Sequence, residues 1–180
     1  NMRSSSSPVV VLGATVGTWL LVDWQSRRAV ATALIREALD ESNTYQEQDR
    51  WPEALASAQR AEALAKRGDS PPHIAFQPAQ RRLDVEMAIA LYDLRAEAGT
   101  HVGFTGTSWA TWADNEYAAR FAKYGVPVDQ LTVEQAASSL SNRSITTALA
   151  VALDSWAAMR IQARGIDDAT WPRIVEIAKR

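Results

Sequence analysis

Four of the eight glycines in this 180-residue chain stand where a helix is expected to stop. They are Gly68, Gly99, Gly125 and Gly165. Each follows an alanine-rich stretch whose apolar residues recur at helical spacing, and Lys or Arg precedes three of them within one turn. Glycine adopts the left-handed turn that ends a helix at little cost, and cations favour a helix C-terminus. The chain is therefore predicted to be a succession of helices with short breaks.

The predicted fold is all-α, an irregular array of helical hairpins with six or seven helices. Runs of alternating β-branched residues are absent from the sequence beyond residue 24, so little sheet is expected. The main helices are expected over residues 25–48, 51–67, 79–98, 108–124 and 144–164. Two shorter helices are expected to begin near Thr132, which forms a capping-box pattern with Gln135, and near Trp171. Loops are predicted over residues 68–78, which are proline-rich, and 99–107.

The first 24 residues form an apolar N-terminal segment, which we separate from a helical interaction domain over residues 25–180. Residues 4–22 carry no charge, and residues 8–22 are their most apolar part. A bilayer-spanning helix needs roughly 20 apolar residues, so the segment is marginal in length. Trp19 and Trp24 lie near its end, where interfacial aromatics are common. A membrane segment or its remnant is the favoured interpretation, followed by packing in a soluble core and then by a signal peptide.

Composition argues against several classes of function. The net charge of −2 gives no electrostatic reason to expect nucleic acid as a partner. The chain has no cysteine, which removes disulfides and thiolate metal sites. His73 and His101 lie in predicted loops and lack the spacing of metal ligands. We therefore predict no catalytic residue, no metal site and no cofactor.

Aromatic residues provide the candidate interaction surface. The helix over 108–124 carries aromatic residues over a broad arc, and Arg160 follows Trp156 at i+4 on another helix. The favoured interpretation is a helix at the centre of the core. The alternative is that one edge lines a groove for a peptide or ligand, with aromatic anchors and an arginine rim. The candidate residues are Trp109, Trp112, Tyr117, Arg120, Trp156 and Arg160.

Several phrases of the sequence resemble known helical proteins. The stretch from Asp49 to Leu64, with Trp51-Pro-Glu-Ala-Leu at its start, is similar to the second helix of a tetratricopeptide repeat. The chain also resembles the region after the transmembrane helix of large membrane-anchored bacterial serine/threonine protein kinases. The phrases that carry this second resemblance are 17–19, the Trp51 stretch, 113–125, 143–145 and 152–157. It implies a kinase domain upstream and a helical sensor or interaction region here. The sequence holds no kinase motif.

The expected function is a non-catalytic helical protein-interaction or sensor module of a larger membrane-anchored signalling protein, plausibly a serine/threonine kinase. Its partner would be a protein or peptide, and its N-terminal segment would associate with a membrane, on a side the sequence does not assign. Two alternatives stay open. One is a small helical enzyme with carboxylate acid/base chemistry, and the other is a structural homo-oligomer. A cytoplasmic location is the alternative to membrane association.

Overall fold

A computed structural model describes residues 9–67, 71–100 and 107–180, with side chains for 24–67, 71–72, 74–97 and 108–180. These residues form seven α-helices and no strand, which confirms the all-α prediction. The helices are α1 (Val9–Glu47), α2 (Trp51–Lys66), α3 (Pro72–Thr100), α4 (Thr107–Lys123), α5 (Val133–Ser141), α6 (Thr146–Arg164) and α7 (Trp171–Lys179). The predicted helix starts near Thr132 and Trp171 are confirmed.

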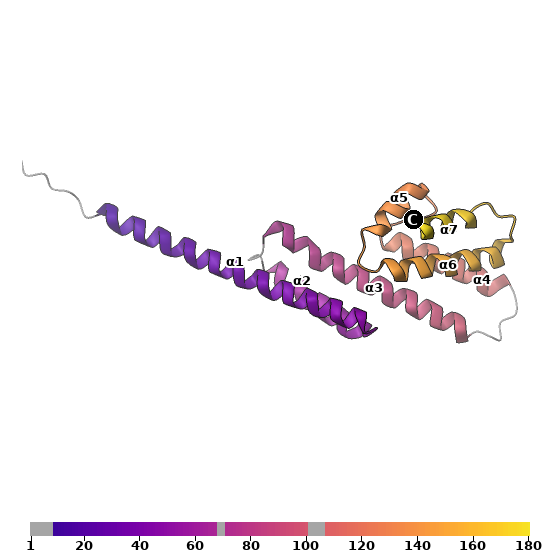
Figure 1. The fold of residues 1–180 in the computed structure, drawn as a ribbon, viewed down its shortest axis with the longest axis horizontal. Coiled ribbons are helices and arrows are strands. Elements are labelled where there is room, and N and C mark those ends of the chain that lie inside the picture. The colour runs from indigo at the N-terminus through magenta and orange to yellow at the C-terminus, as the bar shows by residue number, and fades with distance from the viewer. Residues whose placement is uncertain (1–8, 68–70, 101–106) are drawn as a thin grey trace, which may run out of the picture.

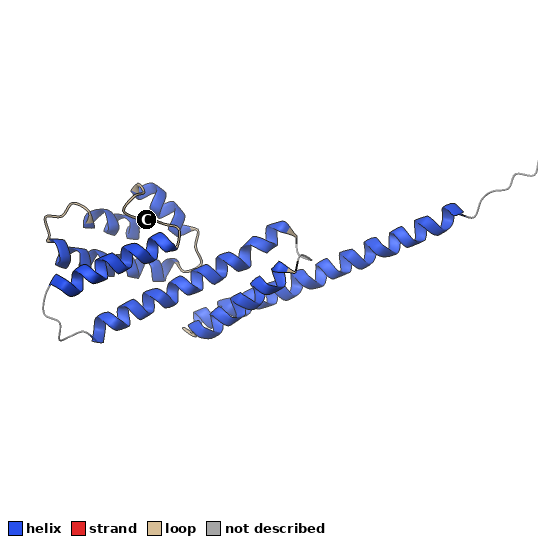
Figure 2. Ribbon diagram, turned by 180° about the vertical axis from the view of Figure 1, so that it is seen from behind, coloured by secondary structure: helices blue, strands red, loops and turns tan. Residues whose placement is uncertain are grey.

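The molecule is elongated, because α1 projects far beyond the other helices (Figure 1). The helix α2 folds back along α1, α3 follows, and α4–α7 cluster at the other end. The view from behind shows the same arrangement, with helices joined by loops and no strand among the described residues (Figure 2). α1 is 39 residues long and begins at Val9, so the helix predicted to start at residue 25 begins earlier. No helix-ending residue separates Val22 from Gln25, and each added residue gains a backbone hydrogen bond.

Small side chains hold α1 and α2 together. Ala54, Ala58 and Ala61 on α2 are fully buried, as is Ser42 on α1. The Ser42 hydroxyl donates a hydrogen bond of 2.9 Å to the Ala54 carbonyl. Short side chains on both faces let the two backbones approach closely.

The helix α3 belongs to both ends of the molecule. Ile74 near its start packs with Ile35 of α1 and Ala65 of α2. Met87 and Leu91, farther along, belong to the core formed with α4–α7. α3 therefore packs against both parts of the molecule and fixes the α1–α2 hairpin relative to the C-terminal bundle.

The loop predicted over residues 68–78 is wrong from Pro72 onwards. Pro72 starts α3, where its missing N–H is harmless, and Pro78 lies inside the helix. Proline inside a helix costs about 3 kcal/mol. Pro78 is buried, and the burial of its ring helps to offset that cost.

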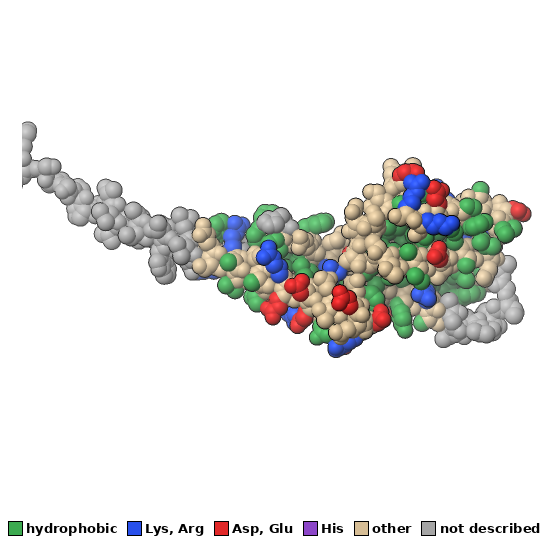
Figure 3. Space-filling view, in the orientation of Figure 1, with side chains coloured by type: hydrophobic (Ala, Val, Ile, Leu, Met, Phe, Trp, Pro, Cys, Tyr) green, Lys and Arg blue, Asp and Glu red, His purple; other side chains and the backbone are tan. Residues whose placement is uncertain are grey.

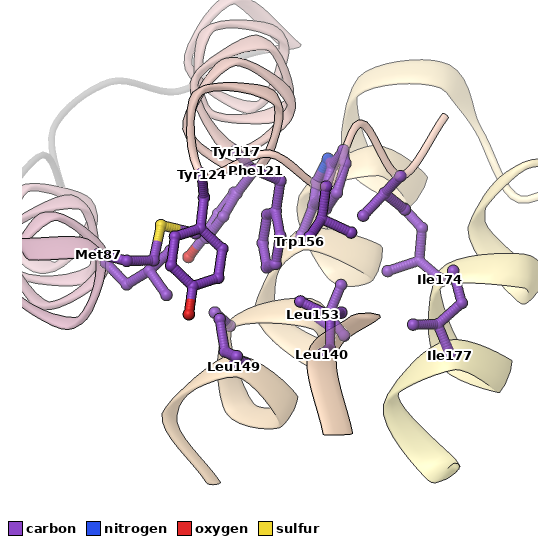
Figure 4. Packing of buried hydrophobic residues seen from close by; sticks show 14 of the residues in the cluster. Met87, Tyr117, Phe121, Tyr124, Leu140, Leu149, Leu153, Trp156, Ile174 and Ile177 are labelled. Atoms are coloured by element: carbon purple, nitrogen blue, oxygen red, sulfur yellow. The ribbon is translucent and has the colours of Figure 1, made fainter. Parts of the chain in front are cut away.

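Trp156 of α6 is the centre of the C-terminal core. Its ring stacks on Phe121 at 5.4 Å and on Tyr117 at 6.2 Å between centroids. Figure 4 shows these three rings among aliphatic side chains from the surrounding helices. The labelled neighbours are Met87, Tyr124, Leu140, Leu149, Leu153, Ile174 and Ile177.

Two of the four glycine stops are confirmed. Gly125 and Gly165 have φ of +89° and +92°. Gly68 lies outside the described residues. Gly99 lies in the last turn of α3, which ends one residue later at Thr100, so the predicted stop is displaced by about one residue. Glycine costs only about 1 kcal/mol in a helix, so it ends one only where the following residues turn the chain.

The end of α4 is a Schellman motif, in which two backbone N–H groups return to the last turn. Val126 N–H donates to the Phe121 carbonyl (2.9 Å), and Gly125 N–H donates to the Ala122 carbonyl (3.0 Å). α1 ends in the same way, with Asp49 at φ +55° in the place of glycine. At α5, Thr132 and Gln135 exchange the two bonds of the predicted capping box.

No helix within the described residues combines the length and the hydropathy that crossing a membrane requires.

Replacing Gly125 by alanine tests the cap of α4. A Cβ at this position would meet no atom within 4 Å, so the effect is purely conformational. We expect Gly125→Ala to lower the free energy of unfolding by about 1–2 kcal/mol. Urea denaturation followed by circular dichroism measures it, with the exposed Ala122→Gly as a control for helix propensity. Unchanged stability would contradict the assigned backbone conformation.

Candidate binding groove

The six residues predicted as an interaction surface do not form one surface. Trp156, Tyr117 and Arg160 are buried, with Trp156 and Arg160 fully inaccessible. Trp109 and Trp112 stack on each other at 4.4 Å near the start of α4, and Trp112 is 37% exposed. Arg120, toward the other end of α4, pairs with Glu116 at 2.6 Å. Three of the six residues are therefore part of the hydrophobic core or buried beside it, whereas the tryptophan pair lies nearer the surface.

Arg160 is the centre of a buried charge network. Its Nε donates to Asp114 at 2.8 Å, and its two terminal nitrogens donate to the carboxylate oxygens of Asp129 at 2.5 and 2.8 Å. The guanidinium also lies over the Trp156 ring at 4.7 Å. Asp129 belongs to the connection between α4 and α5, so one side chain of α6 fixes both a helix and a loop. The i+4 proximity of Trp156 and Arg160 is as predicted, but the pair faces inward.

Asp114 of α4 receives donors from three residues of α6. Trp156 Nε1 donates to one carboxylate oxygen at 2.7 Å and Arg164 Nε donates to the other at 2.8 Å, beside the bond from Arg160. Burial alone would raise the pKa of Asp114, but hydrogen bonds from Arg160 and Trp156 outweigh it and lower that pKa below its ordinary value. The carboxylate is therefore charged, and its donors satisfy its hydrogen-bonding capacity. Its role is to hold α4 against α6.

A second buried carboxylate, Asp84 of α3, joins three elements. One of its oxygens accepts from the Tyr124 hydroxyl at 2.7 Å, and the other accepts from the Ser144 N–H at 3.0 Å and the Ser144 hydroxyl at 2.7 Å. Burial, and then the neighbouring Asp84, raise the pKa of Tyr124, so its hydroxyl keeps the proton that it donates. α6 has no side-chain N-cap, and Asp84 supplies the negative charge that its N-terminus favours.

Ser144 also connects the C-terminal bundle to the α1–α2 hairpin. The side-chain amide of Gln46, in the last turn of α1, donates to the Ser144 carbonyl at 3.0 Å. Arg81 of α3 donates to the amide oxygen of Gln46 at 3.2 Å. Trp51, the first residue of α2, packs against the C-terminal core. The α1–α2 turn is thus held beside the start of α6.

An open groove of about 810 Å³ lies between this turn, α3 and the first half of α6. Its size falls within the range of ligand sites, roughly 300–1,000 Å³. Its lining mixes aromatic and aliphatic side chains with a few polar ones, including Gln46, Asp49, Trp51, Tyr92, Asp93, Arg95, Thr147 and Val151. A pocket of about 190 Å³ between α5, α6 and α7 falls below that range. We take the larger groove as the candidate site.

Tyr92 and Val151 are large apolar side chains that line the groove and are exposed. Tyr92 of α3 is 65% exposed, and Val151 of α6 is 38% exposed. Figure 3 shows acidic and basic side chains scattered over the visible face, with hydrophobic patches between them. A half-open groove with exposed apolar anchors suits a segment of another chain better than a deeply enclosed ligand.

The sequence analysis missed these groove residues. Tyr92 lies one residue after the apolar stripe of its helix, and a large aromatic side chain off the core face was the available signal. Gln46 and Trp51 carry no comparable signal, because their position depends on how the hairpin packs on α3. No group of three acidic or histidine side chains that could hold a metal ion occurs among the described residues. Of the two histidines, His73 lies in α3 and His101 lies outside those residues.

Neither a family model, nor a curated protein, nor a solved structure matches this chain. The fold and the groove therefore define its class: an all-α helical-hairpin protein with an open interhelical groove.

Asp114→Asn tests the buried charge network. The amide group would face donors on Trp156 and Arg160 and would leave Arg160 with less compensating charge. Breaking a buried ion pair from one side costs about 3–5 kcal/mol, so we expect a loss of that order in the free energy of unfolding. Urea denaturation measures it. Asp154→Asn, an exposed carboxylate of α6, is the control and should change stability little.

The network also predicts how stability depends on pH. Because the pKa of Asp114 is lower in the folded chain than in the unfolded chain, its stabilisation is complete above the unfolded value of about 3.9. It is lost as the pH falls through the lower, folded value. We expect the wild type to lose more stability than Asp114→Asn between pH 5 and the acid limit, as measured by urea midpoints. Parallel pH profiles would contradict this assignment.

Proposed function

We propose that this chain is a non-catalytic helical protein-interaction module whose groove binds a peptide segment of a partner protein. The observation that carries the proposal is the open groove between the α1–α2 turn, α3 and α6, with Tyr92 and Val151 exposed in it. Exposed aromatic and aliphatic side chains on rigid helices are the usual anchors for peptide segments.

The two buried carboxylates have a structural role rather than a catalytic one. The buried carboxylates Asp84 and Asp114 are each engaged by several donors and hold helices together. A general acid or base needs a proton that it can exchange with a substrate. Neither carboxylate lines the groove.

We propose further that the module belongs to a larger, membrane-anchored signalling protein, a serine/threonine kinase. Its support is the uncharged N-terminal sequence over residues 4–22 and the resemblance to the region that follows the transmembrane helix in such kinases. The helix α1 carries the end of that segment without a break to Gln46 at the groove. An anchor at one end of α1 and a binding groove at the other is the arrangement we propose.

Selection of a random peptide library on the full chain tests the groove. We expect enriched peptides to bind Val151→Arg at least about tenfold more weakly than the wild type, about 1.4 kcal/mol, because the larger charged side chain fills the groove. Fluorescence anisotropy measures the affinities.

The matched control is Ile166→Arg, which introduces the same side chain at a 70% exposed position away from the groove. Circular dichroism checks that both variants keep their helices. The proposal fails if no peptide is enriched, or if both variants bind the enriched peptides as the wild type does.

A further inference from the structure

We infer that the segment bound in the groove carries a Lys or Arg side chain next to apolar side chains. This inference rests on the proposed function and names the chemistry of the partner. The groove leaves charged side chains unpaired, and their placement on its walls indicates the charge of a partner.

Two carboxylates in the groove have no basic partner among the described residues. Asp49 lies in the α1–α2 turn and Asp93 lies on α3; both are exposed and both line the groove. Elsewhere the acidic side chains are commonly paired, as Glu62 is with Arg82 and Glu116 is with Arg120. The groove therefore holds negative charge that another molecule can neutralise.

Both carboxylates belong to the same wall. Arg82 of α3 faces α2, because it pairs with Glu62 at 2.7 Å. Asp93 follows Arg82 by eleven residues, a spacing of three helical turns that brings it back to that side of α3. Asp49 comes from the hairpin that forms this wall. The negative charge is therefore concentrated on the hairpin side.

Arg95 lies on the opposite wall. It follows Leu91 and Ala88 at spacings of four and seven residues, and those two belong to the core shared with α6. The groove thus presents two carboxylates on one side and one guanidinium on the other. A bound segment would direct its cation toward Asp49 and Asp93 and a carbonyl or carboxylate toward Arg95.

The apolar lining fits the stem of the same cationic residue. Long basic side chains lay their methylene groups on apolar surface and keep the charge outside. Trp51 and Tyr92 also offer aromatic faces, which attract cations. A basic residue flanked by apolar ones matches both the charge and the surface of the groove.

Two peptides that differ only in charge test the inference on the full chain. The probes are the blocked octapeptides LKAYLKAL and LEAYLEAL, titrated into ¹⁵N-labelled protein and followed by NMR. We expect the lysine peptide to shift the amide signals of Tyr92, Thr147 and Val151, and the glutamate peptide to do so at least about fivefold more weakly. Binding of the lysine peptide should weaken as salt rises, because the carboxylates are exposed.

Charge-removing variants sharpen the test. Asp49→Asn keeps a residue that tolerates positive φ, and Asp93→Asn keeps size. Exposed ion pairs change affinity by roughly two- to fivefold each, so the double variant should weaken the lysine peptide by roughly fivefold or more. Asp154→Asn, an exposed carboxylate on α6 outside the groove, should leave the affinity unchanged.

The outcomes separate this inference from the proposed function. Equal binding of the two peptides, unchanged affinity in the double variant, or signal shifts away from the groove would each overturn the cationic partner. Random-library peptides that still lose affinity in Val151→Arg would then keep the groove as a binding site of other specificity. If the library yields no such peptides either, the proposed function fails as well.

Discussion

The arrangement of the molecule depends on one carboxylate, Asp84, at the middle of α3. It is 2% exposed and accepts hydrogen bonds from the end of α4 and from the connection between α5 and α6. An ionised group in such a place is tolerated only if donors replace its water, and here Tyr124, Ser144 and Gln80 do so. Because these bonds fix the start of α6 against α3, they also fix two of the three walls of the groove.

Two pairs of aspartates differ in their burial and in their contacts. Asp84 and Asp114 are buried and hold helices together through several donors each. Asp49 and Asp93 are exposed at the groove. Removing one partner from a buried charge network costs several kcal/mol of stability. An exposed carboxylate contributes little to folding, so its charge is available for binding. The carboxylates that stabilise the fold are thus different from those that we propose to take part in recognition.

The fold was predictable from the sequence where the cause is local. The capping box at Thr132 and Gln135 and the positive φ of Gly125 and Gly165 depend on neighbouring residues, and the sequence predicted them. Pro78 was misread as part of a loop, because the packing of α3 outweighs its poor helix propensity. Arg160 was expected at a rim. Its burial depends on Asp114 and Asp129, which come from distant parts of the chain and give no local signal. For the same reason, the part of the groove formed by Gln46 and Trp51 was not predictable.

The uninterrupted course of α1 has a mechanical consequence. At 1.5 Å per residue, its 39 residues make a rod about 58 Å long, with Val9 at one tip and Gln46 near the other. A helix without proline or a bulge bends little over this length, so its two tips move together. Close packing of small side chains and the hydrogen bond from the Ser42 hydroxyl to the Ala54 carbonyl tie α1 to α2. A displacement of α1 would therefore be felt at the groove, where the Gln46 amide is bonded to the Ser144 carbonyl.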